Sequence, residues 1–180
     1  MRSRVRCVIG TLVVLAVVLA AIVLGAAYRG VIYIGADRPD PAVVAWFLST
    51  TSDRSVARHA ADVRVPPLDR PEMAREGFGY YREMCVECHG APGRPASQAE
   101  VGKGLSPQPP NLAEPAGDLS PKELFWVTRH GISMSGMPAW GETHSDDKLW
   151  NIVAFVETLR HKKPEQYQAL ERSQPRGGGL

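Results

Sequence analysis

The sequence predicts an all-α protein in which one membrane-spanning helix precedes a small helical domain. Two observations predict this fold. No charged residue lies between Cys7 and Tyr28, and a run of about 20 apolar residues is long enough to cross a bilayer as a helix. Further along the chain, three segments carry apolar residues at helical spacing, with helix-capping residues at their ends.

The N-terminal segment, residues 1–28, is interpreted as a membrane anchor. Arg2, Arg4 and Arg6 precede the apolar run, and the positive-inside bias leaves this end in the cytoplasm. The chain is therefore expected to be a single-pass protein of the cytoplasmic (inner) membrane, with its domain on the periplasmic or outer side. A cleaved signal peptide is the alternative, because Gly25-Ala26-Ala27 offers small residues for a cut. The apolar run is longer than a usual signal peptide needs, which favours the anchor.

Residues 29–68 are expected to form a connector. Residues 37–41 read Asp-Arg-Pro-Asp-Pro and favour a turn. Residues 42–48 are apolar and aromatic, and predict a short helix that lies either on the membrane surface or on the following domain. Residues 55–61 predict a second short helical piece.

The compact domain is expected at residues 69–163, and its first helix follows from a capping pattern. Asp69 with Glu72 three residues later resembles a capping box. The apolar residues that follow recur at helical spacing and predict one buried face: Met73, Ala74, Gly77, Phe78, Tyr81 and Met84. A glycine on such a face, here Gly77, usually permits close approach by another helix.

Two more helices have clear boundaries. Ser120, Pro121 and Glu123 are typical of a cap, a first helical residue and its reciprocal partner, and this helix is expected to end before Gly131. The last helix begins after Ser145, with acidic residues at its positive end. Its expected buried stripe is Leu149, Ile152, Val153, Val156 and Leu159, and Pro164 closes it.

Directly after the first helix, residues 85–89 read Cys-Val-Glu-Cys-His. Two thiols three positions apart, followed by histidine, are typical of covalent attachment of a c-type haem. Cys85 and Cys88 would add to the two vinyl groups of haem, and His89 would supply one axial nitrogen to the iron. We therefore expect one covalent haem c. Attachment of this haem outside the cytoplasm agrees with the predicted topology.

Other interpretations of the two cysteines have less support. A thioredoxin-like dithiol needs a βαβ context that the sequence lacks. A structural zinc site usually needs four ligands, and the only other cysteine, Cys7, lies at the head of the apolar run. A structural disulfide would not need His89.

Two stretches are expected to lack regular structure. Residues 90–117 are rich in proline and glycine, and a loop of this length is compatible with a compact domain if it packs on the porphyrin. Residues 164–180 are polar and end in Gly177-Gly178-Gly179-Leu180, so a disordered tail is expected.

The sixth iron ligand is expected in the loop of residues 131–140. Met137 is the preferred candidate, because it lies between flexible Gly136 and Pro138, whose fixed φ can hold the loop. Met134 is the runner-up. A thioether ligand favours reduced iron and raises the potential of a haem protein.

The chain resembles class I cytochrome c, and most closely the membrane-anchored monohaem group. The resemblance rests on Cys-His-Gly-Ala-Pro-Gly at residues 88–93 and Gly-Met-Pro-Ala-Trp at residues 136–140. It covers residues 69–159 and implies a small helical domain wrapped around one covalent haem. It also implies His89 and Met137 as axial ligands, and first and last helices that cross near Gly77 and Trp150.

The resemblance further implies that a proline carbonyl accepts a hydrogen bond from the proximal histidine. Five prolines compete for this role: Pro92, Pro95, Pro107, Pro109 and Pro110. The remaining histidines are not expected to bind iron: His59, His130, His144 and His161.

These features predict a membrane-tethered electron carrier rather than an enzyme. It is expected to carry single electrons between redox protein partners, and it would be a subunit of an oxidoreductase if those partners form a stable complex with it. Residues 70–163 hold 11 Lys/Arg and 12 Asp/Glu, so no field of one sign points to a particular partner. The scattered basic residues give no support to nucleic-acid binding. The alternatives are a haem enzyme or gas/redox sensor with a labile sixth site, and an interaction subunit of a larger complex.

Overall fold

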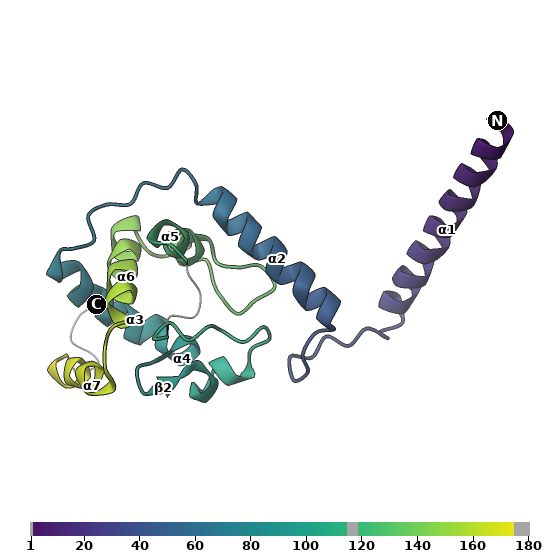
Figure 1. Cartoon of the computed structure of the whole chain (residues 1–180). Coiled ribbons are helices and arrows are strands. Elements are labelled where there is room, and N and C mark those ends of the chain that lie inside the picture. Colours follow the sequence, from purple (N-terminus) through teal and green to yellow (C-terminus); the bar gives the residue numbers. More distant parts are fainter. Residues whose placement is uncertain (1, 115–118, 175–180) are drawn as a thin grey trace. The chain divides into compact units, whose positions relative to one another are not determined.

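A computed structural model of the chain describes residues 2–114 and 119–174. The chain divides into two compact units, one ending at Gly35 and the other beginning at Ala36. The first unit holds helix α1 (Arg2–Tyr28) and the second holds all the other helices (Figure 1). The all-α prediction is confirmed, because the only strands among the described residues are two that are two residues long.

Helix α1 coincides with the predicted anchor. It runs for 27 residues, and residues 4–28 are long and apolar enough to cross a membrane. Its large apolar side chains from Val5 to Leu24 are exposed. A helix of this length and composition is suited to a lipid environment, although a signal sequence has the same properties.

The connector contains one continuous helix where two short pieces were expected. Helix α2 spans Ala42–His59. The polar stretch Ser49–Arg54 between the two expected pieces has no glycine or proline to end a helix, so the backbone continues through it. Only its far half packs on the domain, where Val56 and Ala60 are buried. This part of α2 thus packs on the domain although it precedes residue 69, where the domain is expected to begin.

The core forms where α3 (Pro71–Met84) crosses α6 (Asp146–Leu159). A Cβ atom placed on Gly77 would lie 1.9 Å from the backbone oxygen of Asn151, so only glycine permits this approach. Phe155 lies 5.4 Å from Phe78 and 5.3 Å from Tyr81 between ring centroids. The crossing implied near Gly77 and Trp150 is present, with Asn151 at the closest point.

The predicted buried stripe of α6 is confirmed, and so is that of α3, with Ala74 and Met84 only partly buried. The predicted start of α3 is wrong. The helix begins at Pro71 after Arg70, and no side chain caps it. Proline is favoured at the first helical position, where its missing N–H costs nothing. That preference decides the boundary, rather than the Asp69–Glu72 pair.

Helix α5 (Pro121–His130) begins and ends where the sequence predicted. The backbone N–H of Ser120 donates to the Glu123 carboxylate at 2.8 Å, and the Ser120 hydroxyl donates to the same oxygen. Phe125 stacks on Trp150 of α6 with centroids 4.0 Å apart and planes at 8°. Ser145 also occupies the N-cap position of α6, as predicted, but its side chain makes no capping hydrogen bond.

Short elements position the segment after α3. A single helical turn, α4 (Val86–His89), leads into β1 (Gly90–Ala91), which pairs antiparallel with β2 (Arg94–Pro95). Two 3₁₀ turns follow, η1 (Ala96–Gln98) and η2 (Gly102–Gly104), and η3 (Trp140–Glu142) precedes α6. The rest of the loop up to residue 114 has no regular structure, as expected, and residues 115–117 lie outside the described residues.

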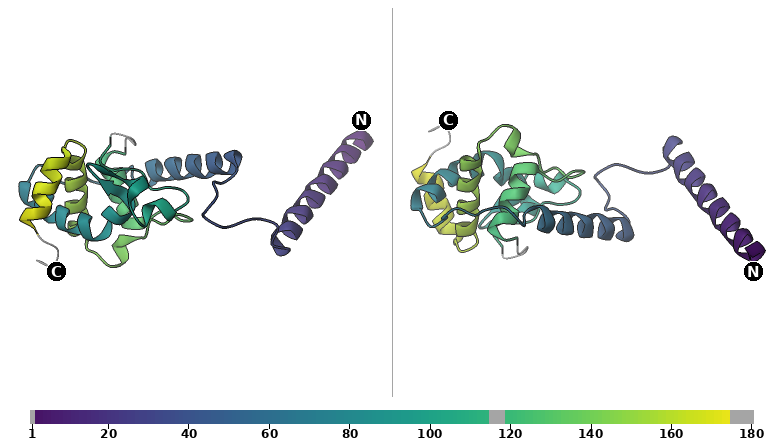
Figure 2. Two further views of the ribbon diagram at one scale, coloured as in Figure 1. Left: turned by 90° about the horizontal axis from the view of Figure 1, so that it is seen from below. Right: turned by 90° about the horizontal axis from the view of Figure 1, so that it is seen from above.

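The expected disorder of the C-terminal tail is wrong for its first part. Pro164–Ser173 form helix α7, which lies beside α3 in both views of Figure 2. Tyr167 is buried and meets Phe78 edge-on at 5.6 Å. Two apolar residues three positions apart, Tyr167 and Leu170, are enough to dock this short helix on the core. The glycine-rich end of the tail lies outside the described residues.

Candidate functional site

The residues of the Cys-Val-Glu-Cys-His motif form a tight turn at the end of α3. The N–H groups of Cys88 and His89 both donate to the carbonyl of Cys85, at 3.1 and 2.8 Å. Residues three apart on a helical turn lie on the same face, so the two thiols are presented together. Cys85 is buried and Cys88 half-buried.

The thiols do not have the electrostatic surroundings of a redox dithiol. Burial, with a smaller effect from Cys88, raises the pKa of Cys85 to about 12. Burial and the nearby Glu87 carboxylate also raise the pKa of Cys88. Catalytic cysteines of the thioredoxin type have lowered pKa values. Within residues 2–114 and 119–174, no three His, Cys, Asp or Glu side chains gather into a metal site either.

His89 is oriented by one backbone hydrogen bond. Its Nδ1 lies 2.9 Å from the carbonyl oxygen of Pro110. A carbonyl only accepts, so Nδ1 carries the hydrogen and Nε2 keeps its lone pair for a metal. Burial lowers the pKa of His89, and the Pro110 hydrogen bond acts in the opposite direction. A neutral imidazole of this tautomer is the form that ligates iron.

This contact identifies the proline that the sequence left open among five. No local signal distinguished Pro110, because the partner of His89 lies 21 residues away along an irregular loop. The contact also shows how the loop serves the site. Residues 90–114 lead the chain back to the motif, where the Pro110 carbonyl holds the His89 ring through Nδ1.

Tyr81 fixes the exit from the motif. Its hydroxyl donates to the carbonyl of Gly90 at 2.7 Å, and the side chain is fully buried. Burial, ahead of the effects of neighbouring charges, raises the pKa of this phenol well above its usual value, so Tyr81 stays a hydrogen-bond donor. Gly90 has a φ of 70°, which allows the chain to turn sharply after His89. The sequence placed Tyr81 on a buried face, but gave no sign of this second role.

Gly102 in η2 lets the loop pack directly against the motif. A Cβ atom at this position would lie 2.3 Å from the carbonyl oxygen of Cys88 and 2.9 Å from that of Ala96. Only glycine allows backbone to approach backbone this closely. The turn that presents Cys88 is therefore backed by main chain.

The loop after α5 holds the two candidate methionines in different surroundings. The Met137 N–H donates to the Ser135 hydroxyl oxygen at 3.1 Å, and the Met137 carbonyl accepts from the Ile132 N–H at 3.2 Å. Its side chain is half-buried. Met134 is 82% exposed and has a φ of 59°, a left-handed backbone conformation.

The base of this methionine loop is tied by Gly131. With a φ of 66°, Gly131 packs on the backbone of residues 137–139, where a Cβ atom would lie 2.7 Å from the Met137 oxygen. The tip of the methionine loop meets the loop of residues 90–114, because Gly136 contacts the side chain of Leu105. The loop that holds Pro110, the partner of His89, is thus in contact with the loop that holds Met137.

The other histidines take part in ring contacts. His59 of α2 stacks on Trp126 at 5.7 Å, and His130 meets the same ring at 4.8 Å. His144 lies 5.6 Å from Trp140 and 6.4 Å from Tyr80, edge-on in both cases. Three of the four histidines outside the motif thus pack against aromatic rings. The fourth, His161, is exposed just after α6.

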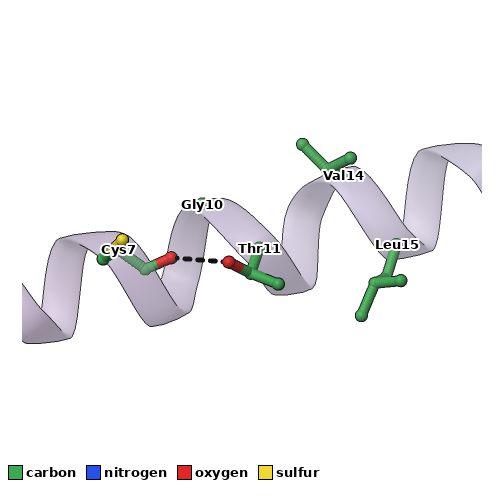
Figure 3. A pocket seen from close by; sticks show the side chains of 5 residues that line it. All are labelled: Cys7, Gly10, Thr11, Val14 and Leu15. Atoms are coloured by element: carbon green, nitrogen blue, oxygen red, sulfur yellow. Dashed lines mark hydrogen bonds between the residues drawn. The ribbon is translucent and has the colours of Figure 1, made fainter.

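A shallow hollow on α1 does not belong to this site. It is lined by Cys7, Gly10, Thr11, Val14 and Leu15 of a single helix (Figure 3). The Thr11 hydroxyl donates back to the Cys7 carbonyl at 3.0 Å, so its one polar side chain is already satisfied.

The donor set fits haem c. It combines the thiols of Cys85 and Cys88 with a neutral His89 imidazole whose Nδ1 is hydrogen-bonded. The thioether of Met137 lies on a loop whose base is packed against Gly131. Sulfur and imidazole are the ligands that haem iron takes in c-type proteins.

Comparison with known proteins agrees with this chemistry. Residues 72–156 match the family model described as cytochrome c oxidase, cbb3-type, subunit III. The match begins in α3, includes the motif and the methionine loop, and ends in α6. No curated protein matches the chain.

Proposed function

We propose that this chain is a membrane-tethered carrier of single electrons. Residues 72–156 form a class I cytochrome c domain, and the chain is therefore a haem-binding electron-transfer cytochrome. One haem is attached through Cys85 and Cys88, and its iron is held by His89 and Met137. The observation that carries this proposal is the tight Cys85–His89 turn, with His89 Nδ1 engaged by Pro110 at 2.9 Å.

Met137 is preferred to Met134 on the basis of its surroundings. Both the N–H and the carbonyl of Met137 are hydrogen-bonded, and its side chain is half-buried. Met134 directs most of its side chain to solvent. An axial ligand must be held toward the porphyrin in both oxidation states, which favours the residue whose backbone is fixed.

The protein's contribution to electron transfer is to keep the ligands in place. Bound haem supplies an iron that accepts and gives up one electron at a time. Pro110 holds the His89 ring, Gly102 backs the thiol-bearing turn, and Ser135 holds the Met137 backbone. Ligands fixed in this way move little when the charge on the iron changes, and small rearrangement favours fast transfer.

Helix α1 is proposed to tether the domain to the cytoplasmic membrane, with the haem on the periplasmic or outer side. The arginines before the apolar run support this orientation. A tether keeps the domain near membrane-bound partners and raises its effective concentration there. Those partners are proposed to be redox proteins. The oxidase-subunit description of the matched family favours a place in a larger oxidoreductase complex as the second candidate function.

The ligand proposal is tested by Met137→Ala, with Met134→Ala as the matched control from the same loop. The ferric wild type is expected to show the long-wavelength sulfur-to-iron absorption band. Met137→Ala is expected to lose it and to lower the reduction potential, because a thioether favours reduced iron. Met134→Ala is expected to keep both properties.

The same spectra distinguish the electron carrier from a haem enzyme or gas sensor. If the wild type lacks the sulfur band and binds carbon monoxide without displacing a ligand, the sixth site is open and the carrier proposal is wrong. If only Met134→Ala removes the band, the ligand assignment must be exchanged. Co-purification of the detergent-solubilised full chain with an oxidase in fixed stoichiometry would favour the complex-subunit role.

A further inference from the structure

The first half of α2 presents an apolar surface that the domain leaves uncovered. Trp46 is 64% exposed and Phe47 59%, and Val43 and Val44 are exposed beside them. No charged residue occurs between Ala42 and Ser52. We call residues 42–48 the α2 tip. It extends away from the rest of the second unit in Figures 1 and 2.

The α2 tip is continuous with the half of α2 that packs on the haem domain. Its own helix continues without a break to His59, where Val56 and Ala60 are buried and His59 stacks on Trp126 of α5. The Ser49 hydroxyl donates to the Trp46 carbonyl at 3.1 Å within the helix. Whatever covers the tip therefore also orients the domain.

The length and composition of the preceding chain indicate what covers the tip. Helix α1 ends at Tyr28 and α2 begins at Ala42, so the residues between them span at most about 45 Å when fully extended. The first part of this link is itself apolar and exposed from Val31 to Ile34. If that part stays at the bilayer interface, residues 35–41 leave the tip within about 25 Å of it.

We propose that the α2 tip lies in the headgroup region of the membrane that holds α1, so that a lipid surface is its partner. Tryptophan and phenylalanine on an exposed helix are suited to this depth. The turn before the tip carries Asp37, Arg38 and Asp40, which gives no excess of positive charge. The contact is therefore apolar in origin and does not require anionic lipid. It gives the haem domain a second point of attachment, which restricts its rotation on the tether.

This inference rests on the proposed insertion of α1, and the experiment reports on both separately. A photoreactive benzophenone side chain is placed at Phe47, at Arg54 or at Leu15 of the full haem-loaded chain. Arg54 is the matched control, because it is exposed on the same helix outside the tip. Each protein is reconstituted in phosphatidylcholine vesicles and illuminated, and lipid adducts are measured by mass spectrometry. The haem spectrum of each variant verifies its fold.

Lipid adducts are expected at Leu15 and Phe47, with a yield at Phe47 several-fold above that at Arg54. Replacing one third of the lipid with phosphatidylglycerol is expected to leave this ratio unchanged. Adducts at Leu15 but not at Phe47 overturn the tip contact and leave the tether intact. Phe47 adducts to a second copy of the chain, or to a protein when native membranes are illuminated, also overturn it. Absence of adducts at Leu15 overturns the tether and the tip contact together.

Discussion

Replacing Gly77 with alanine tests the helix crossing on which the haem domain is built. The new Cβ atom would lie 1.9 Å from the Asn151 oxygen, 2.5 Å from the Asn151 carbonyl carbon and 2.9 Å from the Phe155 Cβ. Two of these three neighbours belong to the backbone of α6. No rotamer change relieves such contacts, so α3 and α6 must separate.

The size of the effect follows from the required shift. The closest contact is about 1.5 Å short of the 3.4 Å at which ordinary van der Waals contact begins. Overpacking of a core typically costs about 1–3 kcal/mol, and the upper part of this range applies to a backbone clash. Alanine regains about 1 kcal/mol in helix propensity. We therefore expect Gly77→Ala to lower the free energy of unfolding by about 2 kcal/mol.

Gly79→Ala is the matched control on the same helix. Nothing lies within 4 Å of the Cβ position at Gly79, so only the propensity gain of about 0.5–1 kcal/mol remains, and this variant is expected to be more stable than the wild type. Denaturant unfolding of the detergent-solubilised haem protein is followed by haem absorbance and circular dichroism. Equal midpoints for the two variants would refute the close helix crossing.

Two further predictions concern the loop and the α5 cap. Gly102→Ala is expected to reduce the fraction of chain that carries covalent haem, because its Cβ would lie 2.3 Å from the Cys88 carbonyl oxygen. Gly104→Ala is the control. Nothing lies within 4 Å of its Cβ position, so it is expected to match the wild type. Haem staining after denaturing electrophoresis measures this, and equal staining would contradict the role given to Gly102. Hydrogen bonds from the Ser120 side chain and backbone lower the pKa of Glu123 below its ordinary value of 4.5. The carboxylate therefore stabilises the fold at neutral pH, and this contribution is lost as pH falls through the lowered pKa. The stability difference between wild type and Glu123→Gln is expected to be small, because the group is near solvent, and to shrink on acidification; a difference that grows would refute the assignment.

The parts of this fold that the sequence predicts are those with local causes. The capping pair Ser120–Glu123 acts within one turn of α5, and the spacing of the buried faces of α3 and α6 repeats along one segment. The Cys85–His89 turn is also local, because the N–H groups of Cys88 and His89 both donate to the Cys85 carbonyl within the turn. The motif and both crossing helices are therefore predictable from the sequence.

The parts that the sequence leaves open depend on contacts between distant segments. Pro110 is one of five prolines in the loop, and only the folded chain brings its carbonyl to His89. In the sequence, α7 looks like a polar tail. It docks on the core through Tyr167, whose partner Phe78 lies far away in the sequence. The continuity of α2 was missed for another reason, since serine and threonine weaken a helix without ending it.

The two candidate iron ligands are held by contacts of different stiffness. On the His89 side, Gly102 meets the backbone of the motif, and a backbone atom cannot move without moving the turn that bears Cys88. On the Met137 side, Gly131 fixes the base of the loop against backbone, but Gly136 at the tip meets only the Leu105 side chain. Side-chain ends yield more easily than main chain. Of the two candidates, His89 therefore lies on the more rigid side of the site. Met137 has a hydrogen-bonded backbone but lies on a loop whose tip can adjust.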